Sequence, residues 1–361
     1  MDGTQNKSTG TGLARRRFII AGGAAIAAPF VLKRPALAAG EVIVRTPGGA
    51  YEEVMRRIVY EPFRQETGIQ ITPVAASMSK LLAMIKTNNI ELDVIDTGDG
   101  PLSSFAAAGA LAPIQFDKWK LANPDSIDVE FKSKTHVAVE VYSSVLAYNT
   151  KTFPNGNHPK SWADFWNVGA FPGQRSLADM ASYYPSLEFA LLADGVPKDK
   201  LYPLDLDRAF KSLSRIRPNI RKFWDTGALS AQLLTDNEVS MGHIWSSRLQ
   251  PLIQSGAPLG LEWNENMIQV QALAIFKGSP NEAAAQRFVE YMLQPKLQAK
   301  YVAELASGPT NKDAFAFFTP EQLANLPGGQ HSRDLGFFQD VVWWEINREK
   351  VNNMWSKWIL G

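Results

Sequence analysis

After its first 40 residues the chain alternates short apolar segments with amphipathic segments, and this alternation limits its fold more than any other feature. Residues 41–47 (EVIVRTP) predict a strand, and residues 50–66 predict a helix. Met55, Val59 and Phe63 recur along one face of that helix, as expected for packing on a sheet. Because the alternation continues through most of the sequence, we expect an α/β fold with a mostly parallel sheet and helices on both faces.

The length and composition of the chain indicate a soluble protein with two lobes. Its 361 residues are too many for one compact core. A hydrophobic content of 45% and a charged content of 20% are typical of globular proteins. The net charge of +1, with no basic run in the body of the chain, excludes nucleic acid as a partner class. The absence of cysteine excludes disulfides and thiol chemistry.

The N-terminal segment has the pattern of an export signal. A basic start that includes Arg15 and Arg16 is followed by an apolar run over residues 18–31 and by a small-residue end at Ala38. The paired arginines resemble the twin-arginine motif, whose cargo crosses the membrane folded. We therefore expect a signal peptide over residues 1–38, cleaved near Ala38, and a mildly acidic mature protein in the periplasm.

The sequence contains no recognised motif for a metal site or for catalysis. The four histidines are far apart and have no cysteine partners: His136, His158, His243 and His331. There is no G-x-S-x-G motif and no glycine-rich phosphate loop. We therefore expect no cofactor, no resident metal and no enzyme activity. A secreted hydrolase that uses two distant carboxylates, Asp96 and Asp225, remains an alternative from another class.

The loops that follow the predicted strands are rich in Gly, Ser, Tyr and Trp. In open α/β sheets the ligand binds beyond the carboxyl ends of the strands, so these loops are expected to converge on one cleft. With few titratable groups, such a cleft favours binding over catalysis. The candidate residues in these loops are Thr46, Gly98, Asp99, Ser143, Ser144, Tyr183, Tyr184, Trp224 and Asp225. For Trp224, a place in the core is an equal alternative.

Several longer segments match one family of transport proteins in their order along the chain. They include ELDVIDTGDG, VLAYNTKTFPNGNHPKSWADFWN, EVSMGHIWSSR and VQALAIFKGSPNEAAAQRFVEYMLQPKLQAKYV, followed by GPTN. In these segments the chain resembles the periplasmic solute-binding proteins of ABC transporters, in the spermidine/putrescine-binding branch. The resemblance implies a monomer that hands a small-molecule ligand to an ABC transporter permease in the inner membrane.

The resemblance also implies the type II periplasmic binding protein fold, in which two lobes are joined by crossing strands with a ligand cleft between them. The N-terminal lobe is expected to comprise residues 39–142 and 271–307. The C-terminal lobe is expected to comprise residues 143–270 and 308–361. Closure over the ligand would turn about the points where the chain crosses between the lobes.

Two positions of the expected pocket differ in charge from the polyamine-binding relatives. Where those relatives have Trp-x-Asp, this chain has Gln269 and Gln271. Where they have Trp-x-x-Asp, it runs from Trp245 through Ser247 to Arg248. A guanidinium facing a diamine is unfavourable, whereas it forms two charge-assisted hydrogen bonds with a carboxylate. We therefore expect a small carboxylate-bearing solute, with an ω-amino acid such as 4-aminobutyrate as the leading candidate.

The amine of such a solute needs a partner of its own. Relatives that bind 4-aminobutyrate-like amino acids keep an Asp where this chain has Gln271, whose amide can accept a hydrogen bond but carries no charge. Glu188 and Asp225 are candidates for the missing carboxylate. Two other ligands remain open, namely a polyamine (putrescine or spermidine) and ferric ion bound through the phenolates of Tyr183 and Tyr184.

Overall fold

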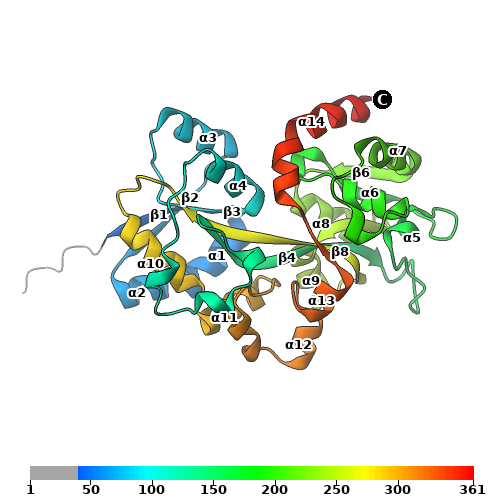
Figure 1. Cartoon of the computed structure of the whole chain (residues 1–361). Coiled ribbons are helices and arrows are strands. Elements are labelled where there is room, and N and C mark those ends of the chain that lie inside the picture. Colours follow the sequence, from blue (N-terminus) through cyan, green and yellow to red (C-terminus); the bar gives the residue numbers. More distant parts are fainter. Residues whose placement is uncertain (1–39) are drawn as a thin grey trace, which may run out of the picture. The chain divides into compact units, whose positions relative to one another are not determined.

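The computed structural model describes residues 40–361, so the predicted signal peptide lies outside the described residues. The described part is a mixed α/β structure built on one sheet, in the strand order β2-β1-β3-β8-β4-β7-β5-β6, with β9 beside β8 (Figure 1). The strands are β1 (Glu41–Arg45), β2 (Gln70–Val74), β3 (Val94–Gly98), β4 (His136–Asn149), β5 (Arg175–Ala178), β6 (Ile220–Trp224), β7 (Met241–Trp245), β8 (Leu259–Ile275) and β9 (Phe337–Phe338).

The α-helices confirm the strand–helix alternation. They are α1 (Gly49–Met55), α2 (Glu61–Thr67), α3 (Met78–Thr87), α4 (Asp99–Ala107), α5 (Trp162–Trp166), α6 (Leu187–Ala193), α7 (Leu206–Ile216), α8 (Gly227–Thr235), α9 (Ser246–Gln254), α10 (Glu282–Met292), α11 (Pro295–Glu304), α12 (Pro320–Ala324), α13 (Gln330–Leu335) and α14 (Val341–Leu360). Within residues 40–361, none of the helices combines the length and the apolarity that crossing a bilayer requires.

The predicted helix over residues 50–66 forms with a change of pitch in its middle. A π-helical turn, Arg56–Tyr60, joins α1 to α2. The turn comes directly before Pro62, which has no N–H to donate and whose ring crowds the carbonyl one turn earlier. The helix ends at Gly68, whose φ of 74° is the left-handed conformation that glycine adopts without steric cost.

The sheet is parallel at both ends and antiparallel in its centre. β1 pairs in parallel with β2 and β3, and β5 pairs in parallel with β6 and β7. The two longest strands, β4 with 14 residues and β8 with 17, run antiparallel to each other between these groups (Figure 1). β8 begins at Leu259, well before the apolar run over residues 267–276.

Three buried clusters divide the hydrophobic interior between two lobes. The first core lies around β1, β2, β3 and α10 and includes Phe63 and Phe288. The second core includes Trp162 and Trp344, and the third includes Trp224. Along β4 the buried side chains belong to the first core as far as Val141 and to the second and third cores from Val145 onward. The predicted division into residues 39–142 with 271–307 and residues 143–270 with 308–361 stays a prediction.

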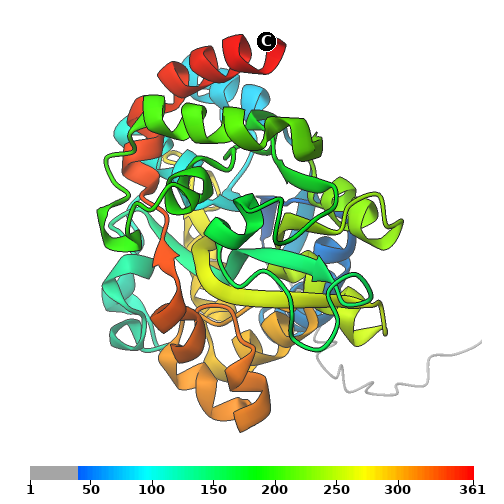
Figure 2. The ribbon, with the colours of Figure 1, turned by 90° about the vertical axis from the view of Figure 1, so that its right-hand side faces the viewer.

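The C-terminal helix α14 packs on the second core. Trp344, Val351 and Trp355 are buried there, and the Trp355 ring lies 6.3 Å from the Phe210 ring of α7. Figure 2 shows the red helix α14 beside the green helices of this lobe. Its first turns also reach α4, which contributes Phe105 to the first core. The helix therefore touches both lobes without passing through the central strands.

Candidate functional site

A cavity of about 620 Å³ lies where the two lobes meet. Its lining comes from β1 and α1, the start of α4, the middle of β4 and β8, residues 182–184, the junction of β7 with α9, and the end of α11. Nine of the residues predicted from the sequence line it: Gly98, Ser144, Tyr183, Tyr184, Trp245, Ser247, Arg248, Gln269 and Gln271. The loops after several strands thus converge as expected.

The other five predicted residues lie outside the cavity lining. Trp224 is fully buried in the third core, where its Nε1 donates to the backbone carbonyl of His243 at 2.8 Å. It is therefore the core residue that the alternative interpretation described. Thr46, which follows β1, and Ser143, which lies in β4, are both buried. Neither side chain lines the cavity.

Asp99 and Asp225, the two predicted aspartates, also lie outside the cavity lining. Asp99 lies in the first turn of α4, and its Oδ1 is 2.8 Å from His136 Nε2. Asp225 is exposed on the loop after β6. Glu188, the other candidate for the missing carboxylate, is fully buried and accepts hydrogen bonds from Tyr202 Oη and Trp344 Nε1, each at 2.6 Å. None of these carboxylates lines the cavity.

Arg248 lies at the start of α9, directly after β7. The hydroxyl of Ser246, the first residue of α9, accepts a hydrogen bond from the backbone N–H of Ser143 at 3.0 Å and so ties the helix start to β4. The Arg248 side chain lines the cavity and is exposed. Within residues 40–361 it has no hydrogen-bond or ion-pair partner, so the cavity contains a guanidinium with all its donors available.

An aromatic corner stands beside this guanidinium. The Trp245 ring lies 6.3 Å from the Tyr142 ring at 71°, an edge-to-face arrangement. Gly227, the first residue of α8, makes room for it. A Cβ at this position would lie 2.7 Å from Trp245 Cε3 and 3.2 Å from Arg248 Cγ.

Sequence analysis missed Glu140, the buried carboxylate of a lining that also includes the charged side chains of Arg45 and Glu304. It pairs with Gln271 across β4 and β8, is 8% exposed, and accepts a hydrogen bond from Ser307 Oγ at 2.8 Å. Burial raises the pKa of its carboxyl to about 8, although Ser307 and Arg248 favour the ionised form. Its position in the apolar run HVAVEVYSS, where an acid is out of place, was the available signal.

Gln271 is held by a polar network beneath the cavity. Its Nε2 donates to Asp96 Oδ1 at 2.7 Å, and Tyr51 Oη donates to Asp96 Oδ2 at 2.7 Å. Asp96 is 1% exposed, and burial raises the pKa of its carboxyl to about 6. Gln271 lines the cavity, and its Oε1 accepts no hydrogen bond from the described residues. Asp96 is thus part of the support, and it shares no site with the exposed Asp225 as a hydrolase would require.

Tyr183 and Tyr184 form one wall of the cavity and are held by α14. The Arg348 guanidinium lies 3.4 Å from the centre of the Tyr183 ring and 5.0 Å from that of Tyr184. Tyr183 Oη donates to Glu345 Oε1 at 3.1 Å. Burial raises the pKa of both phenols, which opposes the phenolate form that an iron ligand requires.

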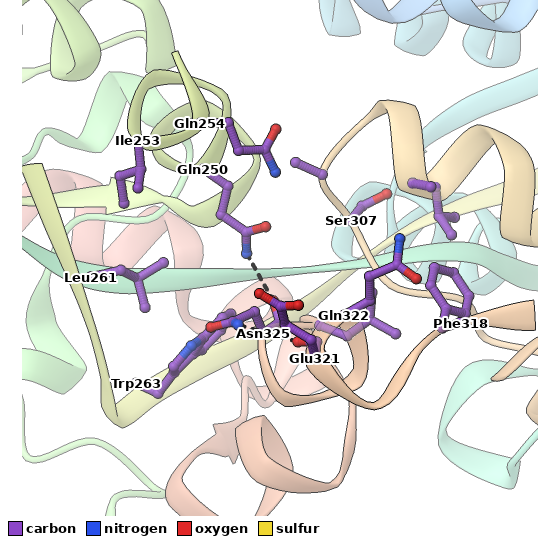
Figure 3. Close-up of a pocket in the computed structure, with 14 residues that line it drawn as sticks. Gln250, Ile253, Gln254, Leu261, Trp263, Ser307, Phe318, Glu321, Gln322 and Asn325 are labelled. Carbon is purple, nitrogen blue, oxygen red and sulfur yellow. Dashed lines mark hydrogen bonds between the residues drawn. The ribbon is translucent and has the colours of Figure 1, made fainter. Parts of the chain in front are cut away.

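A second cavity, of about 480 Å³, lies between α9, α11, α12 and the start of β8. Figure 3 shows its rim of side-chain amides over Trp263 and Leu261, with Gln250 Nε2 donating to the Asn325 carbonyl at 3.1 Å. Its lining contains one carboxylate, Glu321, and no cation. Of these two cavities, only the first is lined by both cationic and anionic side chains.

Comparison with known proteins agrees with this geometry. Residues 59–328 match the model of the bacterial extracellular solute-binding proteins. The chain belongs to this family. Solute-binding proteins bind small molecules, work with ABC transporter permeases and are not enzymes, so the prediction of a transport protein without catalysis is confirmed.

Individual relatives cover most of the chain. A gamma-aminobutyric acid-binding protein of Pseudomonas aeruginosa is 29% identical, covering 86% of this chain and 88% of its own. A spermidine/putrescine-binding periplasmic protein of Haemophilus influenzae is 26% identical, covering 76% and 77%. The crystal structure of an ABC transporter substrate-binding protein from Bradyrhizobium japonicum is 34% identical, with a TM-score of 0.82, covering 88% of this chain and 99% of its own. The predicted two-lobe α/β fold is confirmed by these structures.

The packing of Gly227 yields a prediction for stability. Because an added Cβ would collide with the Trp245 ring, Gly227→Ala is expected to lower the free energy of unfolding by about 1–3 kcal/mol. Gly169→Ala is the matched control, since its Cβ would meet its nearest neighbour, Asn167 Oδ1, at 3.8 Å. Denaturant unfolding measures both; equal stabilities would contradict the packing described.

Proposed function

We propose that this solute-binding protein captures a small ω-amino acid, such as 4-aminobutyrate, and delivers it to an ABC transporter permease. The observation that carries the proposal is that one cavity contains an unpartnered guanidinium, Arg248, and a buried carboxylate, Glu140. A zwitterionic solute satisfies both groups. The export signal predicted over residues 1–38 supports a periplasmic location, where such a protein meets its permease.

Arg248 is proposed to bind the carboxylate of the solute. The planar guanidinium matches a carboxylate with two parallel charge-assisted hydrogen bonds, which together are worth about 1.5–3 kcal/mol. A polyamine would instead bring its cations towards Arg248, and two like charges facing each other are unfavourable. The position of Arg248 therefore favours an anion-bearing solute over putrescine or spermidine.

Glu140 is proposed to bind the ammonium group, with help from the Oε1 of Gln271 beside it. The two side chains are paired in the register of β4 and β8, so a single ammonium can reach both. This arrangement supplies the negative charge that Gln271 lacks. Tyr142 and Trp245 offer apolar ring surfaces for the methylene groups between the two charged ends.

Removal of the guanidinium tests the carboxylate end. Arg248→Ala is expected to weaken binding of 4-aminobutyrate about 10- to 150-fold, because the charge-assisted bonds are lost. Isothermal titration calorimetry gives the affinity, and the melting temperature without ligand should hardly change because Arg248 has no partner among the described residues. Arg287→Ala, an exposed arginine of α10 outside the cavity, is the control. An unchanged affinity in Arg248→Ala would overturn the proposed anchor.

Neutralisation of the buried acid tests the ammonium end. Glu140→Gln is expected to weaken 4-aminobutyrate binding at least tenfold, since the ammonium loses its counter-charge. The same change should stabilise the unliganded protein at pH 7 on the order of 1–3 kcal/mol, because the raised pKa means that burial of this acid costs free energy above its unfolded pKa. Glu188→Gln alters another buried acid outside the cavity and should leave the affinity unchanged.

The pKa of Glu140 also predicts how affinity depends on pH. With a pKa of about 8 in the free protein, Glu140 must lose a proton when an ammonium binds. The affinity for 4-aminobutyrate is therefore expected to fall about tenfold for each pH unit below 8. Calorimetry between pH 5.5 and 8 measures this slope. In Glu140→Gln the slope should flatten, apart from a change near pH 6 that comes from Asp96; a wild-type affinity independent of pH would contradict the assignment.

A further inference from the structure

The helices α4 and α14 meet beside the tyrosine wall of the cavity, and one carboxylate joins them. Glu345 of α14 accepts a hydrogen bond from Ser104 Oγ of α4 through its Oε2 at 2.6 Å. Because α4 buries Phe105 in the first core and α14 buries Trp344 in the second, this bond links the two lobes. It does so by a route that does not pass through β4 or β8.

The other oxygen of Glu345 holds the wall of the cavity. Its Oε1 accepts from Tyr183 Oη at 3.1 Å and from Arg348 Nη2 at 2.6 Å. Arg348 Nη1 donates in turn to the Tyr183 carbonyl at 2.7 Å. The Glu345 side chain is only 13% exposed, so these charge-assisted bonds are poorly screened by water.

Tyr183 needs this support because its backbone is strained. Its φ of 85° lies in the left-handed region, which a tyrosine adopts only when its surroundings hold it there. The contacts with Glu345 and Arg348 are the hydrogen bonds that fix both its phenol and its carbonyl. Loss of those contacts would let the wall residue relax out of the cavity.

Gly100 allows the two lobes to approach at this point. A Cβ there would lie 2.2 Å from Tyr184 Oη and 2.9 Å from Glu345 Oε1. Because no substituent fits in this space, the first turn of α4 comes against both the wall and α14. A single methyl group at position 100 would act as a wedge between α4 and Tyr184.

We propose that Ser104, Glu345, Arg348 and Tyr183 form a latch, the α4–α14 latch, that keeps a captured solute in the cleft. Glu345 acts as a positioning residue that does not touch the solute. When the lobes are together, the latch fixes the tyrosine wall, and a solute that touches the wall favours the latched state by the same free energy. Opening of the latch then limits release. This inference rests on solute capture in the cleft and not on the identity of the solute.

Stopped-flow kinetics with 4-aminobutyrate as the probe test the latch. Glu345→Gln and Ser104→Ala are expected to raise the dissociation rate at least fivefold and to leave the association rate nearly unchanged, because only the latched state is weakened. Glu349→Gln is the matched control, being an exposed glutamate of the same helix with no hydrogen-bond partner among the described residues. Unchanged dissociation rates in both test variants would overturn the proposal.

Hydrogen exchange of the unliganded protein supplies a test that does not depend on the probe. Ser104→Ala and the wedge variant Gly100→Ala are expected to speed amide exchange in α4 and in the first turns of α14, with α10 unchanged. Exchange as slow as in the wild type would contradict the latch even if 4-aminobutyrate failed to bind. Faster exchange together with no binding of 4-aminobutyrate would uphold the latch and reject only the proposed solute.

Discussion

The pairing of β4 with β8 is the constraint on which the rest of the structure depends. These two strands pair over most of their length and run through both lobes. Their register fixes Glu140 opposite Gln271 and Tyr142 opposite Gln269, so one ladder of hydrogen bonds places four cavity residues together. A slip of one residue would turn these side chains to the other face of the sheet. The strands that join the lobes therefore also build the floor of the cleft.

The electrostatics of the cleft depend on how many hydrogen bonds each buried carboxylate of this floor receives. Asp96 accepts hydrogen bonds from Tyr51 and Gln271, which favour its ionised form and let it remain buried as a supporting group. Glu140 receives one hydrogen bond, from Ser307, which is too little to keep a buried carboxylate ionised at neutral pH. An incoming ammonium would complete its coordination and draw off the proton. The carboxylate of the solute would likewise supply the hydrogen-bond acceptors that the unpartnered guanidinium of Arg248 lacks.

The sequence was sufficient for the α/β fold class and for the α9 residues of the cavity lining. Alternation predicted the helices and the parallel strands but not the antiparallel pairing of β4 with β8, and the place of Arg248 came from the resemblance to the solute-binding family. Glu140 was missed because an acid was sought at the position of Gln271, whereas it lies on the neighbouring strand of the pair. Strand pairing between residues this far apart cannot be read from local periodicity. Trp224 was ambiguous because a strand end can face either the cleft or the core.

The contribution of α14 lay beyond sequence reasoning for the same physical reason. Glu345 meets Tyr183 and Ser104 across 162 and 241 positions of the chain. Only the folded structure brings these residues together, and nothing in the helix itself marks Glu345 apart from Glu349. Long-range contacts of this kind set the geometry of the wall, while local patterns set only the elements that carry it.

The most direct test of the account is the number of protons released when 4-aminobutyrate binds. Calorimetry at pH 7 in buffers of different ionisation enthalpy gives this number without any substitution in the protein. If Glu140 takes the ammonium, its pKa of about 8 in the free cleft predicts the release of nearly one proton for each solute bound. Binding that releases no proton would contradict the ion pair between Glu140 and the ammonium group of the solute. It would also contradict the proposal that the cleft binds an ω-amino acid through Glu140 and Arg248.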